Sequence, residues 1–261
     1  MKIFLITKKS IFFLSVLVVL LIVAFSFLTI QDSVNVSAFE HTVLSTELAN
    51  SITKLPKGKE KVAYLTFDDG PTNNVTPKIL DILKAEDVKA SFFVIGKYVD
   101  TYPEITKRAY EEGHFIANHG YDHNPKVLYK SDSNFMDEVR KTDLAISNAI
   151  GVDGYSSHIF RFPTGFMSSN YKAQKRNAVK LLRQMDYTYI DWNCLNNDSV
   201  KKYSNEQLLS NLKKSIKGKD TLVILMHDTK FVSDSSLVLK ETIEYIKSIG
   251  YTFDNFYSLL P

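Results

Sequence analysis

The segment VAYLTFDDGP spans residues 62–71 of this 261-residue chain. Its first six residues form an apolar run rich in β-branched and aromatic side chains, which predicts a buried strand. Two carboxylates, Asp68 and Asp69, follow at once, and Gly70 and Pro71 form a turn signal. Adjacent negative charges repel each other unless a cation or a donor relieves them. We therefore expect one carboxylate to bind a metal ion and the other to act as a base; an Asp-Gly turn that caps the next helix is the alternative.

Outward from this segment, short apolar runs alternate with amphipathic segments. The predicted strands are Val62–Phe67, Ala90–Ile95, Phe115–Asn118, Ile159–Phe162, Tyr187–Ile190 and Leu222–Met226. The predicted helices are Thr76–Ala85, Tyr102–Glu112, Asn134–Ile150, Tyr171–Met185, Asn205–Lys217 and Ser235–Ile249. Several are followed by a glycine, such as Gly113 or Gly151, which is typical of a helix C-terminus. The alternation predicts an α/β protein with repeated β-α units around a parallel sheet or barrel.

Polar, mostly titratable residues stand at the ends of the predicted strands. They are Asp68, Asp69, His119, Arg161, Asp191 and His227. Because the carboxyl ends of parallel strands form the active-site face in β/α architectures, we expect these side chains to converge. Their repetition at this one edge indicates catalysis rather than a structural role.

His119 and His123 lie four residues apart, so that a helical turn or a tight loop could aim both imidazoles at one point. Together with Asp69 they would form a two-histidine, one-carboxylate metal site with open positions for water and substrate. This ligand set suits Zn²⁺, and Co²⁺, Ni²⁺ or Mn²⁺ could also occupy it. Taken alone, a pair of solvent-facing histidines is the alternative.

The composition is that of a globular protein, with 44% hydrophobic and 23% charged residues, and it leaves room for one catalytic domain, predicted over residues 60–261. The formal net charge of +3 is too small to suggest nucleic-acid binding. Cys194 is the only cysteine, which excludes an intramolecular disulfide and a multi-cysteine zinc cluster. No feature of the sequence predicts a protein partner.

The N-terminal region carries an uncharged apolar run over residues 11–30, preceded by lysines and followed by Asp32. As a helix, this run would span about 30 Å, the thickness of the hydrocarbon core of a bilayer. We expect residues 1–30 to be a membrane anchor with a cytoplasmic N-terminus, residues 31–59 to be an extracellular stalk, and the catalytic domain to lie outside the cell. Secretion after signal cleavage near Val36–Ala38 is the alternative.

Five short motifs give the chain a family resemblance. They are TFDDGP at residues 66–71, the pair His119 and His123, RFPTG at 161–165, DWNCLNNDS at 191–199 and LMH at 225–227. With these motifs the chain resembles the polysaccharide deacetylases of carbohydrate esterase family 4, the NodB-homology group, over residues 60–261. The resemblance implies a distorted (β/α) barrel and a metal-dependent hydrolase.

The resemblance also implies roles for individual residues. Asp68 would be the catalytic base, Arg161 would hold and tune it, and His227 would be the general acid. The backbone N–H of Thr164 would face the oxyanion. Asp198 is aligned with the aspartate that braces the arginine.

The motifs depart from the family pattern at several places. Asp191 is a possible substitute for Asp198, because Ser199 stands where the fourth motif usually has tryptophan. Gly120 stands where the second motif has serine or threonine, and its missing hydroxyl would loosen the loop. Thr164 replaces an aromatic residue, so that an aromatic substrate contact would be lost.

The substrate implied by export and by the resemblance is a cell-wall polysaccharide, with N-acetylglucosamine of peptidoglycan first. N-acetylmuramic acid, chitin-type oligomers and acetylxylan remain open, as does a catalytically silent surface module that only binds glycans. Tyr121, Trp192 and Leu225 are candidate substrate contacts. For the two aromatic residues, Tyr121 and Trp192, a place in the core is an equally open alternative.

Overall fold

The computed structural model describes residues 61–229 and 233–260. Their strands are β1 (Val62–Asp68), β2 (Ser91–Val94), β3 (Phe115–Asn118), β4 (Ile159–Phe160), β5 (Thr188–Tyr189), β6 (Cys194–Leu195), β7 (Thr221–His227) and β8 (Thr252–Asp254). They form one sheet in the order β5-β4-β3-β2-β1-β7-β6, and each pairing is parallel. The predicted anchor (residues 1–30) and stalk (residues 31–59) lie outside the described residues.

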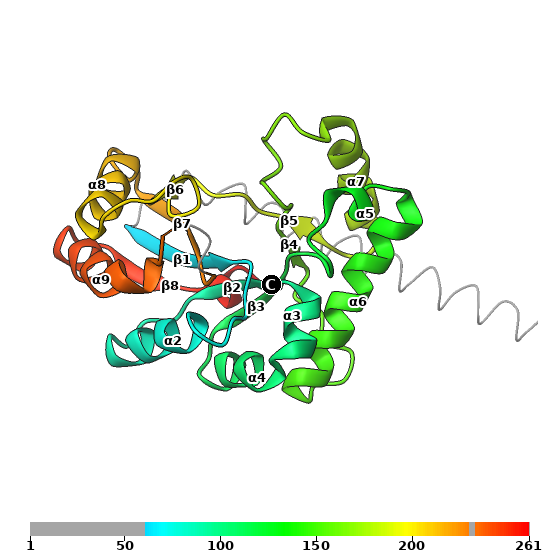
Figure 1. Ribbon diagram of the computed structural model, residues 1–261, viewed down its shortest axis with the longest axis horizontal. Helices are drawn as coiled ribbons and strands as arrows, with labels where there is room; N and C mark the ends of the chain where they lie inside the picture. The colour runs from blue at the N-terminus through cyan, green and yellow to red at the C-terminus, as the bar shows by residue number, and fades with distance from the viewer. Residues whose placement is uncertain (1–60, 230–232, 261) are drawn as a thin grey trace, which may run out of the picture. The chain divides into compact units, whose positions relative to one another are not determined.

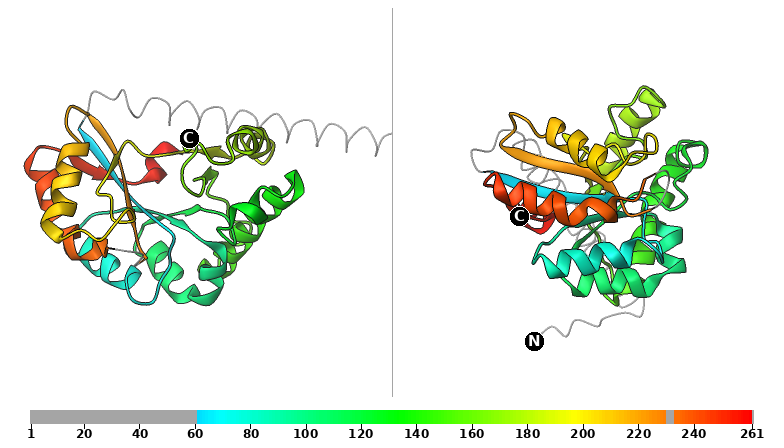
Figure 2. Two further views of the ribbon diagram at one scale, coloured as in Figure 1. Left: turned by 45° about the horizontal axis from the view of Figure 1, so that its top comes forward. Right: turned by 60° about the vertical axis from the view of Figure 1, so that its left-hand side comes forward.

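Strand β1 is the centre of the sheet. It pairs with β7 along its whole length, with β2 at residues 66–68, and with β8 at residues 62–64. The sheet curls (Figure 2), and within residues 61–229 and 233–260 no pairing closes it between β5 and β6. The predicted α/β class with a parallel sheet is therefore confirmed, and the predicted distorted barrel is a curled, open half-barrel.

Helices surround the sheet (Figure 1). They are α2 (Thr76–Ala85), α3 (Gly96–Thr101), α4 (Pro103–Glu111), α5 (Pro125–Leu128), α6 (Asp132–Ile150), α7 (Lys172–Gln184), α8 (Asn205–Ser215) and α9 (Leu239–Ser248), with 3₁₀ turns η2 (Ser235–Val238) and η3 (Phe256–Leu259). Local signals fix several ends: Ser204 forms a capping box with Gln207 before α8, and Gly151 ends α6 in the left-handed region at φ 72°. None of these helices is long and apolar enough to cross a membrane.

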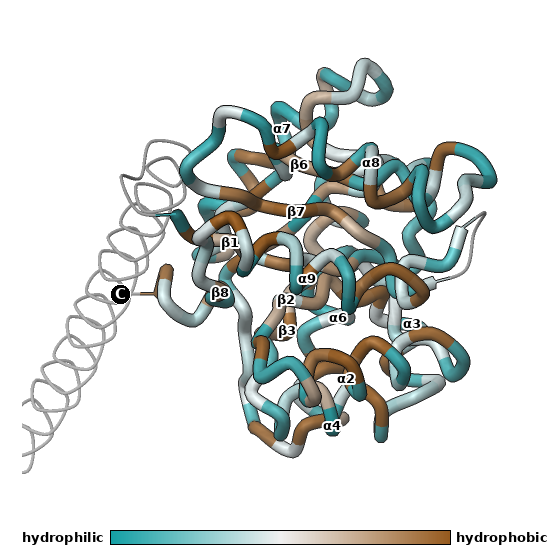
Figure 3. The backbone as a smooth tube through the Cα atoms, turned by 90° about the vertical axis from the view of Figure 1, so that its left-hand side faces the viewer, coloured by the Kyte–Doolittle hydropathy of each residue, from teal (hydrophilic) through white to brown (hydrophobic). Residues whose placement is uncertain are grey.

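Strands β1 and β7 are almost entirely buried, on both faces of the sheet, and Figure 3 colours much of both strands as hydrophobic. Side chains on β1 alternate between the faces. Leu65 and Phe67 pack in the cluster that contains the helix residues of α2 and α9, whereas Tyr64 packs with Phe93 and with Phe256 of η3 on the other face. Thr66 and Asp68 share the face of Tyr64, so that this face becomes polar toward the carboxyl end of the strand.

All six predicted strands and six predicted helices exist, with ends shifted by a few residues. The segment Ser235–Ile249, predicted as one helix, begins as the 3₁₀ turn η2 before α9. Strands β6 and β8 and helices α3 and α5 were not predicted. Each has only two to six residues, too few to show a hydrophobic period.

Candidate active site

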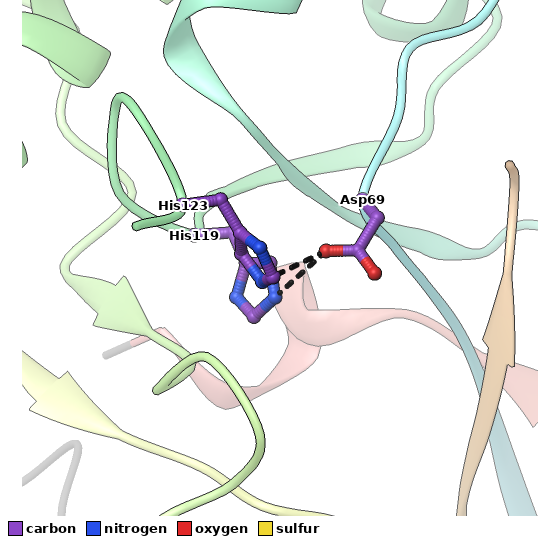
Figure 4. Close-up of side chains that lie close together, drawn as sticks. All are labelled: Asp69, His119 and His123. Atoms are coloured by element: carbon purple, nitrogen blue, oxygen red, sulfur yellow. Dashed lines mark ion pairs between the residues drawn. The ribbon is translucent and has the colours of Figure 1, made fainter. Parts of the chain in front are cut away.

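Asp69, His119 and His123 meet at the carboxyl edge of the sheet. Asp69 directly follows β1 and His119 directly follows β3, while His123 lies in the loop before α5. The Oδ1 atom of Asp69 lies 3.3 Å from Nε2 of His119 and 3.0 Å from Nε2 of His123. Figure 4 shows both imidazoles directed at this one carboxylate oxygen. The structure therefore brings together the three residues predicted from spacing.

The geometry of these three residues fits a bound metal ion. Their ligand atoms lie within 4.8 Å of one another, and a tetrahedral ion about 2.0–2.1 Å from each ligand holds neighbouring ligands about 3.3 Å apart. Asp69 Oδ1 is buried and accepts no hydrogen bond from any described residue. Because buried polar atoms are nearly always paired, this oxygen is suited to a cation.

The charge states of Asp69 and His123 suit metal binding. His119 differs, because burial alone would lower its pKa but the carboxylates of Asp68 and Asp69 outweigh burial and raise it, so that a metal ion would have to displace its proton. Burial alone would raise the pKa of Asp69, but the neighbouring imidazoles of His119, His123 and His227 lower it to about 2. Burial, and then the charge of His119, lower the pKa of His123 to about 4. An ionised carboxylate and a neutral imidazole are the forms that bind a metal ion.

The backbone and a second contact orient these ligands. Asp69 has φ 75°, in the left-handed region, which aspartate tolerates better than most residues. Nδ1 of His119 lies 2.7 Å from the carbonyl oxygen of Arg161. Since a carbonyl only accepts, Nδ1 carries a proton. In the neutral ring the lone pair of Nε2 then faces Asp69, which is the tautomer that a metal requires.

Arg161 holds Asp68 in the buried part of the site. Its Nη1 donates to Asp68 Oδ1 and to Thr66 Oγ1, both at 2.7 Å. Its Nε donates to the carbonyl of Ile190 and its Nη2 to the carbonyl of Asp191. The predicted contact of Arg161 with Asp68 is thus present, and Asp68 Oδ2 lies 3.8 Å from Nε2 of His119.

The expectation that Asp198 braces Arg161 is wrong. Asp198 Oδ1 lies 2.7 Å from Nδ1 of His227, and its Oδ2 accepts from the backbone N–H of His227 and from the hydroxyl of Ser235. The short strand β6 ends three residues before Asp198 and pairs with β7, which places this carboxylate beside His227. The arginine is braced instead by main-chain carbonyls.

His227 reaches the metal-binding residues from the last position of β7. Its Nε2 lies 3.8 Å from Asp69 Oδ2. Burial alone would lower the pKa of His227, but the hydrogen bond and charge of Asp198, with the charges of Asp68 and Asp69, raise it to about 9. A protonated imidazole with a fixed orientation is suited to donate a proton.

The loop that carries Thr164 is held by the carboxylate of Asp191. The carboxylate of Asp191 accepts from the amides of Phe166 and Met167, so that only the main-chain carbonyl of Asp191, and not its side chain, contacts Arg161. Thr164 has φ 66° and is exposed. Trp192 lies against Gly165, where an added Cβ would approach its ring to 2.8 Å. The oxyanion role of the Thr164 amide stays a prediction.

The other candidate substrate contacts have structural partners. Tyr121 donates from its hydroxyl to Asp100 of α3 and packs against Gly96, where an added Cβ would meet its ring at 2.5 Å. Leu225 is buried on β7, two residues before His227, and so on the same face of the strand. Substrate binding by Tyr121, Trp192 and Leu225 stays a prediction.

The sequence of this chain matches the family model "Polysaccharide deacetylase" over residues 56–190. The chain belongs to the polysaccharide deacetylase family. It is 34% identical to the putative polysaccharide deacetylase YheN of Bacillus subtilis, over 74% of this chain and 66% of YheN. It is also 32% identical to the peptidoglycan-N-acetylmuramic acid deacetylase PdaA of Bacillus subtilis, over 77% of this chain and 72% of PdaA.

A further relative is named for a different sugar, and a solved structure supports the fold. The peptidoglycan-N-acetylglucosamine deacetylase PgdA of Listeria monocytogenes is 34% identical over 77% of this chain, which spans only 40% of PgdA. A CE4 esterase of Streptococcus mutans has a similar structure, with a TM-score of 0.71 and 29% identity over 79% of this chain and 90% of that chain. These likenesses agree with the predicted resemblance and with the deacetylase fold.

One buried carboxylate of this deacetylase domain has no role in the sequence analysis, although it directly follows His227. Asp228 Oδ2 accepts from Thr76, and its backbone carbonyl accepts from Thr72. Its backbone N–H donates to the carbonyl of Asp68. Burial raises the pKa of Asp228 to about 7. Asp228 thereby ties the end of β7 to the turn that carries Asp69.

Proposed function

We propose that this chain is a metal-dependent deacetylase that removes the N-acetyl group of N-acetylglucosamine in peptidoglycan and releases acetate. One observation carries the proposal: a metal-binding trio lies beside two further groups suited to proton transfer. Asp68 is within 3.8 Å of one ligand, His119, and His227 is within 3.8 Å of another, Asp69. A base and an acid on either side of a metal site are what hydrolysis of an amide requires.

The metal site consists of Asp69, His119 and His123. When bound there, a divalent ion supplies Lewis acidity, which polarises the acetyl carbonyl and makes water a better nucleophile. Zn²⁺ suits two imidazoles and one carboxylate best, and Co²⁺, Ni²⁺ and Mn²⁺ also fit this ligand set.

Asp68 takes the proton from the attacking water. Its Oδ1 accepts a hydrogen bond from the buried guanidinium of Arg161, which orients the carboxylate. Its Oδ2 is then free to face the water, because the arginine contact uses the other oxygen. The backbone N–H of Thr164 donates to the oxygen that becomes negative as the water adds.

His227 delivers a proton to the leaving nitrogen, which cannot depart as an amide ion. Asp198 holds Nδ1 of His227 at 2.7 Å, so that Nε2 is the atom that faces the reaction. The pair resembles other carboxylate-imidazole pairs in which the carboxylate fixes the tautomer and stabilises the charged ring.

The substrate and location rest on two kinds of support. Relatives at 32–34% identity are named for deacetylation of peptidoglycan, at N-acetylmuramic acid in one case and N-acetylglucosamine in another. The apolar run over residues 11–30 is long enough to anchor the chain with its catalytic domain outside the membrane, next to the cell wall. Cleavage near residue 38 would instead release the domain, which N-terminal sequencing of the mature protein distinguishes.

The test is acetate release from purified peptidoglycan, chitooligosaccharide and acetylxylan, with and without a chelator. We expect release from peptidoglycan that stops with chelator and returns with Zn²⁺. Muramidase digestion of the product, which leaves the remaining N-acetyl groups in place, should show glucosamine as the new amino sugar. Asp68→Asn should keep the metal and lower kcat by at least about a hundredfold, the typical contribution of a general base. His119→Ala should lose the metal.

Each part of the proposal has its own contrary result. Activity that survives complete metal removal would refute metal dependence, and metal retained by His119→Ala would refute the ligand assignment. Newly exposed muramic acid instead of glucosamine would refute the proposed sugar. Glycan binding without release of acetate from any of the three polymers would favour the silent binding module.

A further inference from the structure

The loop between the two metal-binding histidines is anchored by a residue of a distant helix. Glu138 lies on α6 and is only 4% exposed. Its Oε2 accepts from the backbone N–H of Tyr121 at 3.0 Å and from that of Asp122 at 2.8 Å. These are two of the three residues between His119 and His123, so that a single carboxylate oxygen holds the middle of the loop.

The third of these amides is anchored from another side. The N–H of Gly120 donates to the side-chain oxygen of Asn118 at 3.0 Å. The Asn118 amide group in turn donates to the carbonyl of Val139 and to Oδ1 of Asp143, both on α6 and both at 2.9 Å. Three successive amides are therefore held directly or indirectly by α6, and the loosening expected from the missing hydroxyl at Gly120 is offset by these contacts.

The loop needs such support because of its backbone. Gly120 has φ 83° and His123 has φ 54°. The left-handed region costs a residue with a side chain about 1 kcal/mol or more, and histidine adopts it only where its surroundings hold it there. Hydrogen bonds from amides to a carboxylate are about twice as strong as those to a neutral acceptor, so Glu138 is suited to supply this support.

We propose that Glu138 is a positioning residue of the metal site: its carboxylate fixes the loop so that His123 faces Asp69 together with His119. The proposal rests on the proposed function only in taking these three residues as metal ligands. Glu138 hydrogen-bonds the backbone of the loop and, within the described residues, makes no hydrogen bond or ion pair with the three ligand side chains, so that it acts on the metal through the geometry of the loop.

The test compares Zn²⁺ affinity in Glu138→Ala and in Asp137→Ala, measured by competition with a chromophoric chelator at a temperature where each protein is folded. Asp137 is the preceding residue on α6, is exposed and pairs with Arg140, which makes it a matched control. We expect Glu138→Ala to weaken Zn²⁺ binding by about 10- to 100-fold, the usual effect of groups that orient metal ligands. Asp137→Ala should bind Zn²⁺ as the unmodified chain does.

A second readout separates positioning from general support of the fold. At saturating Zn²⁺, Glu138→Ala should regain kcat within about threefold of the unmodified chain, because Asp68, Arg161 and His227 are untouched. Glu138→Gln keeps a neutral acceptor and should lose only about three- to tenfold in affinity, so it serves as the test variant if Glu138→Ala does not fold.

The failures of the two proposals are distinguishable. An unmodified chain that binds no Zn²⁺ would refute the metal site itself, and with it the proposed function. A chain that binds Zn²⁺ equally well with or without the Glu138 carboxylate would refute only the positioning role. Equal weakening by Asp137→Ala would likewise overturn it, because the effect would then belong to the helix surface and not to the loop contact.

Discussion

The guanidinium of Arg161 shows how single contacts set the site. It is completely buried, and a buried charge is tolerated only when it is paired and hydrogen-bonded. Within the described ranges, Asp68 is its one carboxylate partner, and its other acceptors are the neutral oxygens of Thr66, Ile190 and Asp191. The ring of Phe93 lies 3.8 Å from Cζ and covers one face. Arg161 therefore fixes the direction of the Asp68 carboxylate.

Gly70 is required at its position by the carboxylate of Asp228. An added Cβ would lie 1.9 Å from Asp228 Oδ2 and 2.4 Å from its Oδ1, far inside contact distance. We expect Gly70→Ala to lower the free energy of unfolding by about 1–3 kcal/mol, the usual cost of overpacking a core. Urea denaturation measures this loss.

The matched experiment places the same change in an Asp228→Ala background. Removing the carboxylate removes the atoms that the new methyl group meets, so Gly70→Ala should then cost clearly less than in the unmodified chain. If both backgrounds lose the same free energy, the glycine is needed for some reason other than Asp228.

At the scale of elements, helix α7 stabilises the loop that carries Thr164. Lys175 is only 1% exposed, and its ammonium donates to the carbonyl of Gly165 and to the hydroxyl of Ser168, both at 2.5 Å. Lys175→Met keeps the length of the side chain and removes both of these hydrogen bonds, so that the carbonyl of Gly165 keeps only the hydroxyl of Ser168 as a donor. We expect a loss of about 1–3 kcal/mol in unfolding free energy, with faster hydrogen exchange at the amides of Phe166 and Met167.

The control for this prediction is Lys180→Met, an exposed position on the same helix. It removes the same charge without removing a buried hydrogen bond, so its effect should stay within about 0.5 kcal/mol. Equal losses for the two variants would show that the charge of α7, and not the contact to the loop, is what stabilises this region.

The elements also show what the sequence can predict. Strands β1 and β7 and helix α6 are long and clearly patterned, and their positions were predicted to within two residues. The metal ligands were found because His119 and His123 are close in the chain and Asp69 has a strand before it. Each of these correct predictions depends on residues that lie close together in the sequence or on a visible hydrophobic period.

The contacts that were not predicted join residues that lie far apart in the sequence. The partner of His227 is Asp198, 29 residues away, and the contact depends on β6, a strand of two residues with no readable period. Glu138 reaches its loop across 16 residues from within a regular helix, where it reads as an ordinary polar position. Contacts set by tertiary packing leave no local pattern, so the structure was needed to find them.

At the scale of the whole molecule, the two edges of the sheet differ in chemistry. The carboxyl edge gathers the metal-binding and proton-transfer groups, whereas the amino edge is occupied by His114, which is 1% exposed and precedes β3. Its Nδ1 accepts from the N–H of Ala90, just before β2, at 3.1 Å. In β/α architectures the edge opposite the active site contributes to stability.

His114 therefore makes the stability of the molecule depend on pH. Burial, then the charge of Lys89, lower its pKa to about 4, with Glu112 raising it and Arg108 lowering it. Because the folded pKa lies below the unfolded value near 6.5, unfolded chains take up the proton first as pH falls. The contribution of His114 to stability is complete above about pH 6.5 and is lost toward pH 4. Between pH 7 and pH 5 this loss is about 2 kcal/mol.

The variant His114→Asn isolates this effect, because the asparagine oxygen can replace Nδ1 as acceptor but does not titrate in this range. Urea unfolding of both metal-free proteins from pH 7 to pH 5 should show a fall in unfolding free energy that is steeper, by about 2 kcal/mol, in the unmodified chain. Protonation of the active-site groups is common to both proteins and cancels in the comparison. Parallel curves would mean that His114 takes up its proton equally well in the folded and unfolded chains, and the amino edge would then contribute stability without pH dependence.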